Sequence, residues 1–118
     1  MLDSVQEIEG TELSELMASS SQNLRIVDVR ETHEHMQGIV PGSELVPLAT
    51  LPGRLNEFAQ DEKLIMVCRS GARSAQACLF LQQQGFGNVF NLRGGMLDWA
   101  ERNLPIAEFN PVGTEKHF

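Results

Sequence analysis

The chain has 118 residues, and 42% of them are hydrophobic against 21% that are charged. This length suits a single domain with one core, and the composition excludes an intrinsically disordered chain. The formal net charge of −7 argues against a general affinity for nucleic acid or for an anionic membrane surface.

The N-terminal residues and the cysteines indicate a reducing, cytoplasmic setting. The first residues contain neither a basic n-region nor an apolar h-region, so no signal peptide is predicted. No apolar run approaches the length that spans a membrane. Cys68 and Cys78 are the two cysteines, and they form no metal-ligand spacing with the three histidines. We therefore expect no metal, no disulfide framework and a cytoplasmic protein.

Strands and helices are predicted to alternate along the chain. The first expected elements are a strand over 4–8, a helix capped by Thr11 and a strand over 24–29. A short polar helix over 31–36, in which His33 and His35 are expected to be solvated, is followed by a turn at Pro41-Gly42 and a strand over 44–47. The next element is a helix with Leu51, Leu55, Phe58 and Ala59 on one face. In the second half of the chain the expected elements are a strand over 64–67, a helix from 72 that ends at Gly85, a strand over 88–92 and a helix over 96–102. This order predicts an α/β fold with a parallel sheet covered on both faces. Residues 109–118 lack periodicity and are expected to be a tail or extension of a domain over 1–108.

The stretch 64–74, with the sequence LIMVCRSGARS, is the most informative part of the chain. Its apolar run predicts a strand buried on both faces, and a helix is predicted to follow from Ala72. The loop over 68–73 therefore lies at the N-terminal end of a helix, where backbone N–H groups and the helix dipole favour negative charge. We expect this field to hold Cys68 as a thiolate, the nucleophilic form of cysteine. Arg69 and Arg73 add two side-chain cations to this polar, glycine-containing loop, which is expected to be open to anions.

An isolated cysteine at the end of a buried strand is more often a small core residue than a nucleophile. Here, however, the next residues form a polar, basic loop that cannot be packed away from water. Two of the nine Lys and Arg residues fall within 68–73 of an acidic chain, which favours a small anionic ligand. Cys78 and Trp99 are interpreted as buried packing residues.

Other polar residues are predicted to lie near the loop. Asp28, Cys68 and Arg93 fall at or just after strand ends, and parallel strands bind ligands at that edge of the sheet. Asp28 and Arg30, with Glu34, are interpreted as a structural charge network in preference to a catalytic one. Arg93 is expected either to join the anion site or to pair with an acidic neighbour.

At this point the motifs resemble those of a known family, the single-domain rhodanese-like sulfurtransferases. The resemblance rests on Asp28-Val-Arg30 with Glu34 and the turn over 38–43, on the loop over 67–74, and on Leu92-Arg-Gly-Gly95 followed by Trp99. One departure is Ile39, where the family usually has histidine. We interpret that histidine as structural, so the departure does not affect the chemistry.

The resemblance implies a three-layer α/β/α fold with a five-stranded parallel sheet. It also implies transfer of a sulfane sulfur through a Cys68 persulfide, from thiosulfate or a persulfide donor to a thiophilic acceptor such as cyanide or a thiol. The implied partners are a small anionic sulfur donor such as thiosulfate and a protein persulfide donor or acceptor, and no metal or organic cofactor is implied. The implied substrate-binding residues are Arg69, Ser70, Gly71, Ala72 and Arg73. Arg69 and Arg73 would bind the sulfonate end of the donor, and the backbone N–H groups of 69–73 would hold the terminal sulfur.

Two other functions are compatible with a cysteine in an anion-binding loop. Phosphatases and arsenate reductases of related fold place five residues between cysteine and arginine, whereas four separate Cys68 from Arg73 here. The tighter loop matches a persulfide sulfur better than a phosphate. A non-catalytic rhodanese-like binding module is the other alternative, and the intact Cys68 within a basic loop argues against it.

Overall fold

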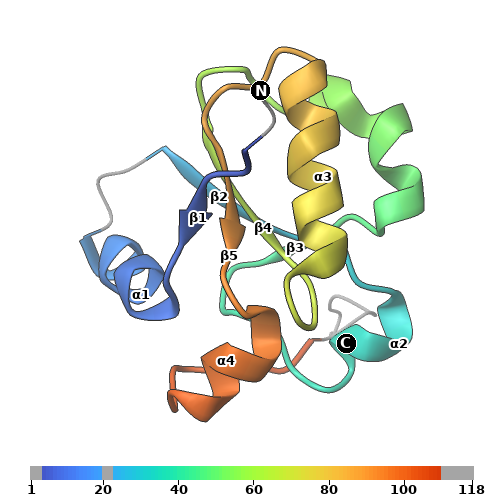
Figure 1. Cartoon of the computed structure of the whole chain (residues 1–118). Coiled ribbons are helices and arrows are strands. Elements are labelled where there is room, and N and C mark those ends of the chain that lie inside the picture. Colours follow the sequence, from blue (N-terminus) through green and yellow to red (C-terminus); the bar gives the residue numbers. More distant parts are fainter. Residues whose placement is uncertain (1–3, 20–22, 110–118) are drawn as a thin grey trace, which may run out of the picture.

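The computed structural model describes residues 4–19 and 23–109, and Figure 1 shows the arrangement of its elements. Its helices and strands, in chain order, are β1 (Glu7–Ile8), α1 (Gly10–Ser19), β2 (Leu24–Asp28), α2 (Thr32–His35), β3 (Glu44–Leu45), the 3-10 helix η1 (Leu48–Glu57), β4 (Lys63–Val67), α3 (Ala72–Gln83), β5 (Val89–Leu92) and α4 (Gly95–Glu101).

The five strands form one sheet in the order β1-β5-β4-β2-β3, and every pair of neighbours is parallel. This arrangement confirms the predicted five-stranded parallel sheet. β4 lies at the centre, and its last residue, Val67, is aligned with Asp28 at the end of β2. The loop that follows β4 therefore emerges from the middle of the sheet, at the end where α2 and α4 lie (Figure 1).

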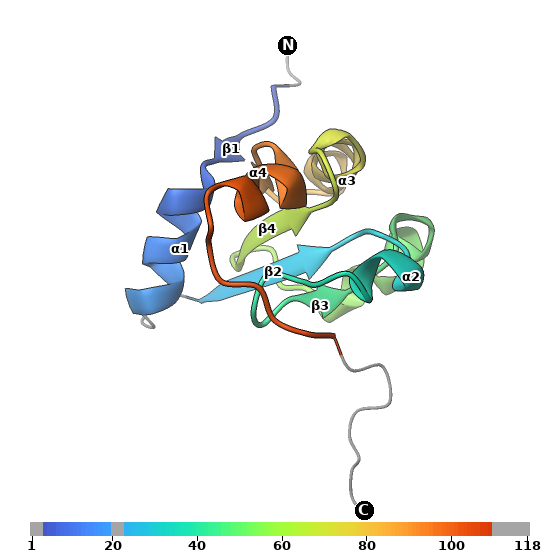
Figure 2. The ribbon, with the colours of Figure 1, turned by 90° about the horizontal axis from the view of Figure 1, so that it is seen from below.

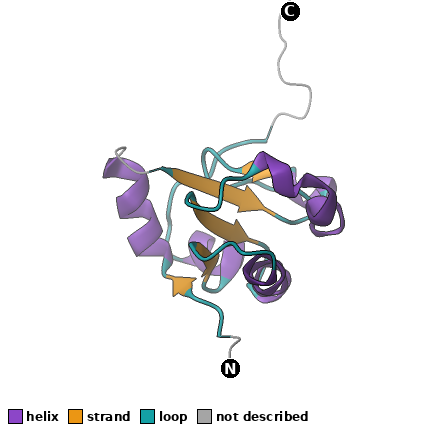
Figure 3. Ribbon diagram, turned by 90° about the horizontal axis from the view of Figure 1, so that it is seen from above, coloured by secondary structure: helices purple, strands orange, loops and turns teal. Residues whose placement is uncertain are grey.

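Two cores cover the two faces of the sheet. α3 and η1 pack on one face, whereas α1 and α4 pack on the other, as Figures 2 and 3 show for α1 and α3. β4 supplies Leu64 and Met66 to the first core and Ile65 and Val67 to the second. This alternation explains why its sequence is an unbroken apolar run.

The residues interpreted as packing groups are buried. Cys78 is fully buried in the core beneath α3. Trp99 is buried in the opposite core, and its indole Nε1 donates a hydrogen bond to the Pro105 carbonyl oxygen at 2.7 Å. Both predictions of a packing role agree with these positions.

Some predicted boundaries are wrong. α1 begins at Gly10, so Thr11 lies inside its first turn and is not its N-cap. Pairing in the outermost strands is limited to Glu7–Ile8 and Glu44–Leu45, and short edge strands protect a sheet from pairing with other chains.

The helix predicted around Leu51 is a 3-10 helix that ends before Phe58, and its backbone departs from helical geometry at Arg54. Pro52 within it lacks the N–H that α-helical bonding would use. Phe58 follows this helix with an extended backbone, and its side chain is nevertheless buried, whereas Ala59 is exposed. A regular helical face therefore does not describe this segment.

Of the predicted tail over 109–118, residues 110–118 lie outside the described residues. The predicted boundary between a domain over 1–108 and this tail therefore stays a prediction. Among residues 4–19 and 23–109, no helix has both the length and the apolarity needed to cross a membrane.

Candidate active site

Cys68 lies directly after β4, with 1% of its surface exposed. α3 begins four residues later on one side of the loop. On the other side, the first turn of α4 donates two hydrogen bonds to the loop, from Met96 N–H to the Cys68 carbonyl oxygen at 2.9 Å and from Leu97 N–H to the Arg69 carbonyl oxygen at 3.0 Å. The loop over 68–73, called the active-site loop below, is therefore held from both sides.

Three polar groups converge on the Cys68 sulfur. The Gly71 N–H donates to Sγ at 3.1 Å, and the Ser74 N–H donates to it at 3.3 Å. The Ser74 hydroxyl oxygen lies 3.2 Å from the same sulfur. Gly71 has a φ of +105°, which glycine adopts without a steric penalty and which lets the loop turn its N–H toward the sulfur. The arrangement is a cradle for negative charge at Sγ.

These contacts distinguish the two cysteines. Burial alone would raise the pKa of Cys68, but hydrogen bonds from the Ser74 hydroxyl and from the N–H groups of Ser74, Gly71 and Ser70 outweigh it and lower that pKa. Among the described residues no such donor contacts Cys78, and burial raises its pKa to about 12. A thiolate is therefore more favourable at Cys68 than at Cys78.

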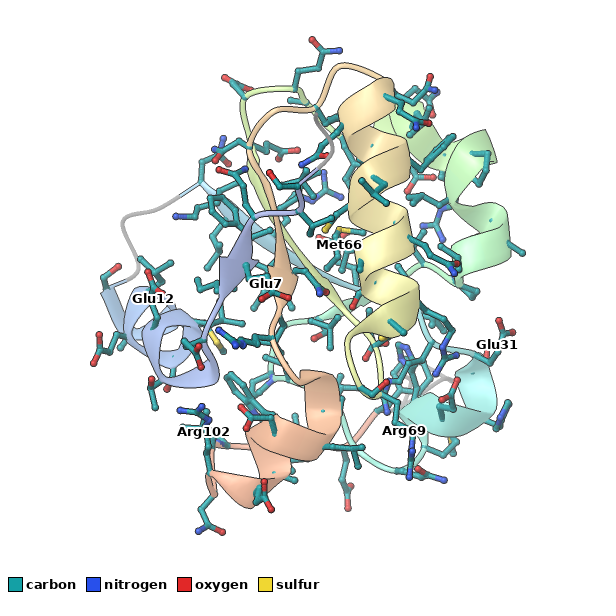
Figure 4. All side chains as sticks on the ribbon, in the orientation of Figure 1. Glu7, Glu12, Glu31, Met66, Arg69 and Arg102 are labelled. Carbon is teal, nitrogen blue, oxygen red and sulfur yellow. The ribbon has the colours of Figure 1, made fainter. Side chains whose placement is uncertain are left out.

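The two arginines of the loop have different surroundings. Arg73 forms a two-pronged ion pair with Glu34, at 2.8 Å and 2.7 Å, which ties α3 to α2. Arg69 is exposed and forms no ion pair within the described part of the chain. Figure 4 shows Arg69 between α2 and α4. Arg69 is thus available to attract an anion, whereas the guanidinium of Arg73 is already paired with the Glu34 carboxylate.

The Glu34 carboxylate titrates in an unusual range. The hydrogen bond from Arg73, opposed in part by burial, lowers the pKa of Glu34 from 4.5 to about 2. Because this pKa is lower in the folded protein, the ion pair contributes stability above pH 4.5 and loses that contribution as the pH falls toward 2.

Glu34→Gln is expected to lower the free energy of unfolding at pH 7 by about 1 kcal/mol, since Arg73 is 36% exposed and water screens the pair. The difference between wild type and variant should shrink as the pH falls from 4.5 to 2, which chemical denaturation at each pH would measure. Glu15→Gln, at an exposed position on α1, is the control and should show no such trend. A difference for Glu34→Gln that is constant with pH would contradict the assigned ion pair.

Asp28 and Arg30 form a buried ion pair at the end of β2. The Arg30 guanidinium donates to both Asp28 carboxylate oxygens, at 2.8 Å to 3.1 Å. It also donates to the carbonyl oxygens of Gly38 at 2.8 Å and Glu34 at 3.3 Å. These contacts join β2, α2 and the turn after α2. Arg30 reaches only the backbone carbonyl of Glu34, whereas the Glu34 carboxylate predicted for the same network pairs with Arg73.

His35 corrects the prediction of two solvated histidines. His33 is exposed, but His35 is fully buried, and its ring meets the Phe109 ring edge-on with centroids 5.1 Å apart. His35 Nε2 lies 3.2 Å from Asp28 Oδ1, although the contact lacks the geometry of a hydrogen bond. Desolvation lowers the pKa of His35, against the attraction of Asp28. The ring is therefore neutral near pH 7 and belongs to the packing around Asp28.

Arg93 pairs with two acidic neighbours. It lies 3.4 Å from Glu9 and 3.8 Å from Glu7, with 66% of its side chain exposed. Of the two alternatives predicted for Arg93, the geometry favours the ion pair.

Two residues at the site were not predicted as functional, Ser74 and Asn91. Both are buried, and the Ser74 hydroxyl donates to Asn91 Oδ1. The available signal was an amide in the middle of the strand VFNL, because a buried polar side chain requires a partner. The described residues contain no group of three or more His, Cys, Asp or Glu side chains placed to hold a metal ion.

Comparisons with known proteins assign the family. The model of the rhodanese-like domain matches residues 9–102, and the chain therefore belongs to the rhodanese-like family. A sulfurtransferase of Allochromatium vinosum is 43% identical over 102 residues, which cover 86% of this chain and 94% of the relative. The thiosulfate sulfurtransferase GlpE of Pseudoalteromonas translucida is 32% identical over 78 residues, which cover 66% of this chain and 74% of the relative.

A solved structure agrees with these relatives. The crystal structure of a rhodanese-like domain protein from Staphylococcus aureus matches with a TM-score of 0.76 at 34% identity, and the match covers 88% of this chain and 100% of that one. The family, the fold and the relatives named as sulfurtransferases together support a sulfurtransferase role.

Proposed function

We propose that the protein moves a sulfane sulfur through a persulfide on Cys68, from thiosulfate or a persulfide donor to cyanide or a thiol. The observation that carries this proposal is the convergence of the Gly71 and Ser74 N–H groups and the Ser74 hydroxyl on the Cys68 sulfur. The thiosulfate sulfurtransferase among the relatives supports thiosulfate as a donor.

The proposed reaction has two steps and consumes no oxidant. The Cys68 thiolate attacks the outer sulfur of thiosulfate, an S–S bond forms, and sulfite departs with the electrons of the broken S–S bond. The new terminal sulfur carries the negative charge and lies near the N–H groups of the active-site loop, which stabilise it as an oxyanion hole stabilises developing charge. Cyanide or a thiolate then attacks that sulfur, and Cys68 leaves as the thiolate. Arg69 attracts the anionic donor.

The surroundings of Arg73 disfavour phosphate chemistry. An arginine that cradles a phosphate must turn its guanidinium toward the bound anion, but both terminal nitrogens of Arg73 are bonded to Glu34. The hydrogen bonds that converge on the Cys68 sulfur and lower its pKa, in turn, disfavour a purely structural module, because a binding role does not require such donors.

Incubation with thiosulfate and cyanide should produce thiocyanate, and Cys68→Ser should abolish its formation. Cys78→Ser is the matched control and should retain it, since Cys78 is held as a buried thiol. Hydrolysis of p-nitrophenyl phosphate is measured in parallel. Phosphate ester hydrolysis that depends on Cys68, without thiocyanate formation from thiosulfate or persulfide donors, would overturn the proposal in favour of the phosphatase.

A further inference from the structure

Asn91 is linked to the proposed nucleophile through the Ser74 hydroxyl. The residue is 2% exposed, and its Oδ1 accepts a hydrogen bond from the Ser74 hydroxyl. Its Nδ2 donates to the Gly71 carbonyl oxygen at 3.1 Å and to the Glu7 carboxylate at 3.4 Å. A carbonyl and a carboxylate only accept hydrogens, so these partners fix the orientation of the Asn91 amide.

The Ser74 hydroxyl has a single hydrogen for two acceptors. One is Asn91 Oδ1, which has no hydrogen to give, and the other is the Cys68 sulfur, 3.2 Å from the Ser74 oxygen. When Cys68 is a thiol, its own S–H can donate to the Ser74 oxygen while Ser74 donates to Asn91. When Cys68 is a thiolate, its charged sulfur attracts the hydroxyl hydrogen, and a Ser74 hydroxyl that turns to the sulfur leaves the buried Asn91 oxygen without its donor. Leaving a buried acceptor without a donor is unfavourable.

We propose that Asn91 is a positioning residue that competes with the Cys68 sulfur for the single hydroxyl hydrogen of Ser74. The hydroxyl hydrogen then follows the charge on Sγ and stays covalently bound to Ser74 throughout. It points to Sγ in the thiolate, and it points to Asn91 when Sγ is neutral.

The role of this competition in turnover rests on the proposed function. In the persulfide the negative charge is on the terminal sulfur, and Sγ is bonded to two atoms and neutral. Asn91 therefore favours the persulfide over the free thiolate. When the acceptor removes the terminal sulfur, charge returns to Sγ and the Ser74 hydrogen turns back to it.

Other titratable groups around the sulfur include Arg69, the next residue of the loop, together with Arg73, Cys78 and Glu7. Arg73 and Cys78 each interact electrostatically with Cys68, and Glu7 interacts with Cys78 and contacts Asn91. A substitution of Asn91 changes none of these residues. An Asn91 substitution also frees the Glu7 carboxylate, and an effect of that carboxylate on the titration of Cys68 would be the same with and without Ser74. The effect of the proposed competition, in contrast, requires Ser74.

The test is the pH profile of iodoacetamide alkylation at Cys68, followed on the Cys68 peptide by mass spectrometry. It compares wild type with Asn91→Leu, Ser74→Ala and the double variant. Asn91→Leu should move the midpoint of the profile to lower pH and speed alkylation below the midpoint roughly two- to tenfold, the equivalent of one net hydrogen bond. Ser74→Ala should move the midpoint to higher pH, and adding Asn91→Leu to it should cause no further change.

Two results would overturn the proposal: a rise in the midpoint for Asn91→Leu, or an equal shift with and without Ser74. Asn91→Ala, which only removes atoms, is analysed in the same way should the leucine variant fail to fold. Alkylation requires no sulfur transfer. Failure of thiosulfate to load Cys68 would therefore overturn the proposed function while the alkylation profiles still decide the role of Asn91.

Discussion

Gly95→Ala is expected to cost about 3 kcal/mol or more of the free energy of unfolding and to remove the enhanced reactivity of Cys68. Gly95 has a φ of +58°, where a residue with a Cβ pays roughly 1–2 kcal/mol. A Cβ there would also lie 2.5 Å from the carbonyl oxygens of both Cys68 and Arg69. Overpacking of this kind costs a further ~1–3 kcal/mol. Since these carbonyls accept the N–H groups of the first turn of α4, relief of the clash must move α4 away from the active-site loop.

Gly42→Ala is the matched control for this prediction. Gly42 has a φ of +83°, but a Cβ there would meet nothing within 4 Å. The control therefore pays only the backbone cost of roughly 1–2 kcal/mol and should leave alkylation of Cys68 unchanged. Urea denaturation and the alkylation rate measure both effects. If Gly95→Ala and Gly42→Ala lowered the free energy of unfolding equally and left the alkylation rate of Cys68 equal, the close approach of α4 to the loop would be contradicted.

Arg30→Met is expected to be the other severely destabilising substitution, with a loss of about 3–5 kcal/mol in the free energy of unfolding. Asp28 is fully buried, and Arg30 is its cationic partner, at 2.8 Å. Methionine would fill part of the space but would leave the carboxylate buried without a counter-charge. The loss of the bond to the Gly38 carbonyl oxygen would also release the turn after α2.

The control for Arg30 is Arg102→Met, because Arg102 pairs with Asp98 and Glu9 at the surface, where 37% of its side chain is exposed. Exposed pairs contribute about 1 kcal/mol or less, so this variant should stay close to wild type. Thermal and urea denaturation of both variants measure the difference. A loss for Arg30→Met no larger than that for Arg102→Met would refute the assignment of a buried, mutually dependent pair.

The sequence predicts the fold well where hydrophobic pattern and turn chemistry agree. The apolar run of β4 indicates a strand with both faces buried, and β4 does contribute to both cores. The alternation of strands with helices predicts the parallel sheet, because parallel strands require crossovers. Cys68 and its loop could be placed at the end of β4 for the same reason. The Gly94-Gly95 pair was visible only as part of a motif, and the structure supplies its physical reason in the approach of Gly95 to the loop carbonyls.

The parts of the site that escaped prediction depend on contacts between distant residues. Arg73 and Glu34 are 39 positions apart, and no local pattern pairs them. Ser74 and Asn91 meet only because α3 and β5 pack together. The sequence around His35 indicates an exposed residue of a short polar helix, but in the structure its ring packs against Phe109, 74 positions along the chain. Local spacing carries no information about such tertiary partners.

The most direct test of the central claim, that Cys68 is the residue that carries sulfur, is the mass of the protein after incubation with thiosulfate. We expect a gain of about 32 Da, the mass of one sulfur in a persulfide intermediate, located on the Cys68 peptide and removed by cyanide as thiocyanate. The Cys68→Ser variant should gain nothing, and the Cys78 peptide should keep its mass. An unmodified Cys68 after incubation with thiosulfate and with persulfide donors, or sulfur bound to Cys78 in its place, would contradict the account.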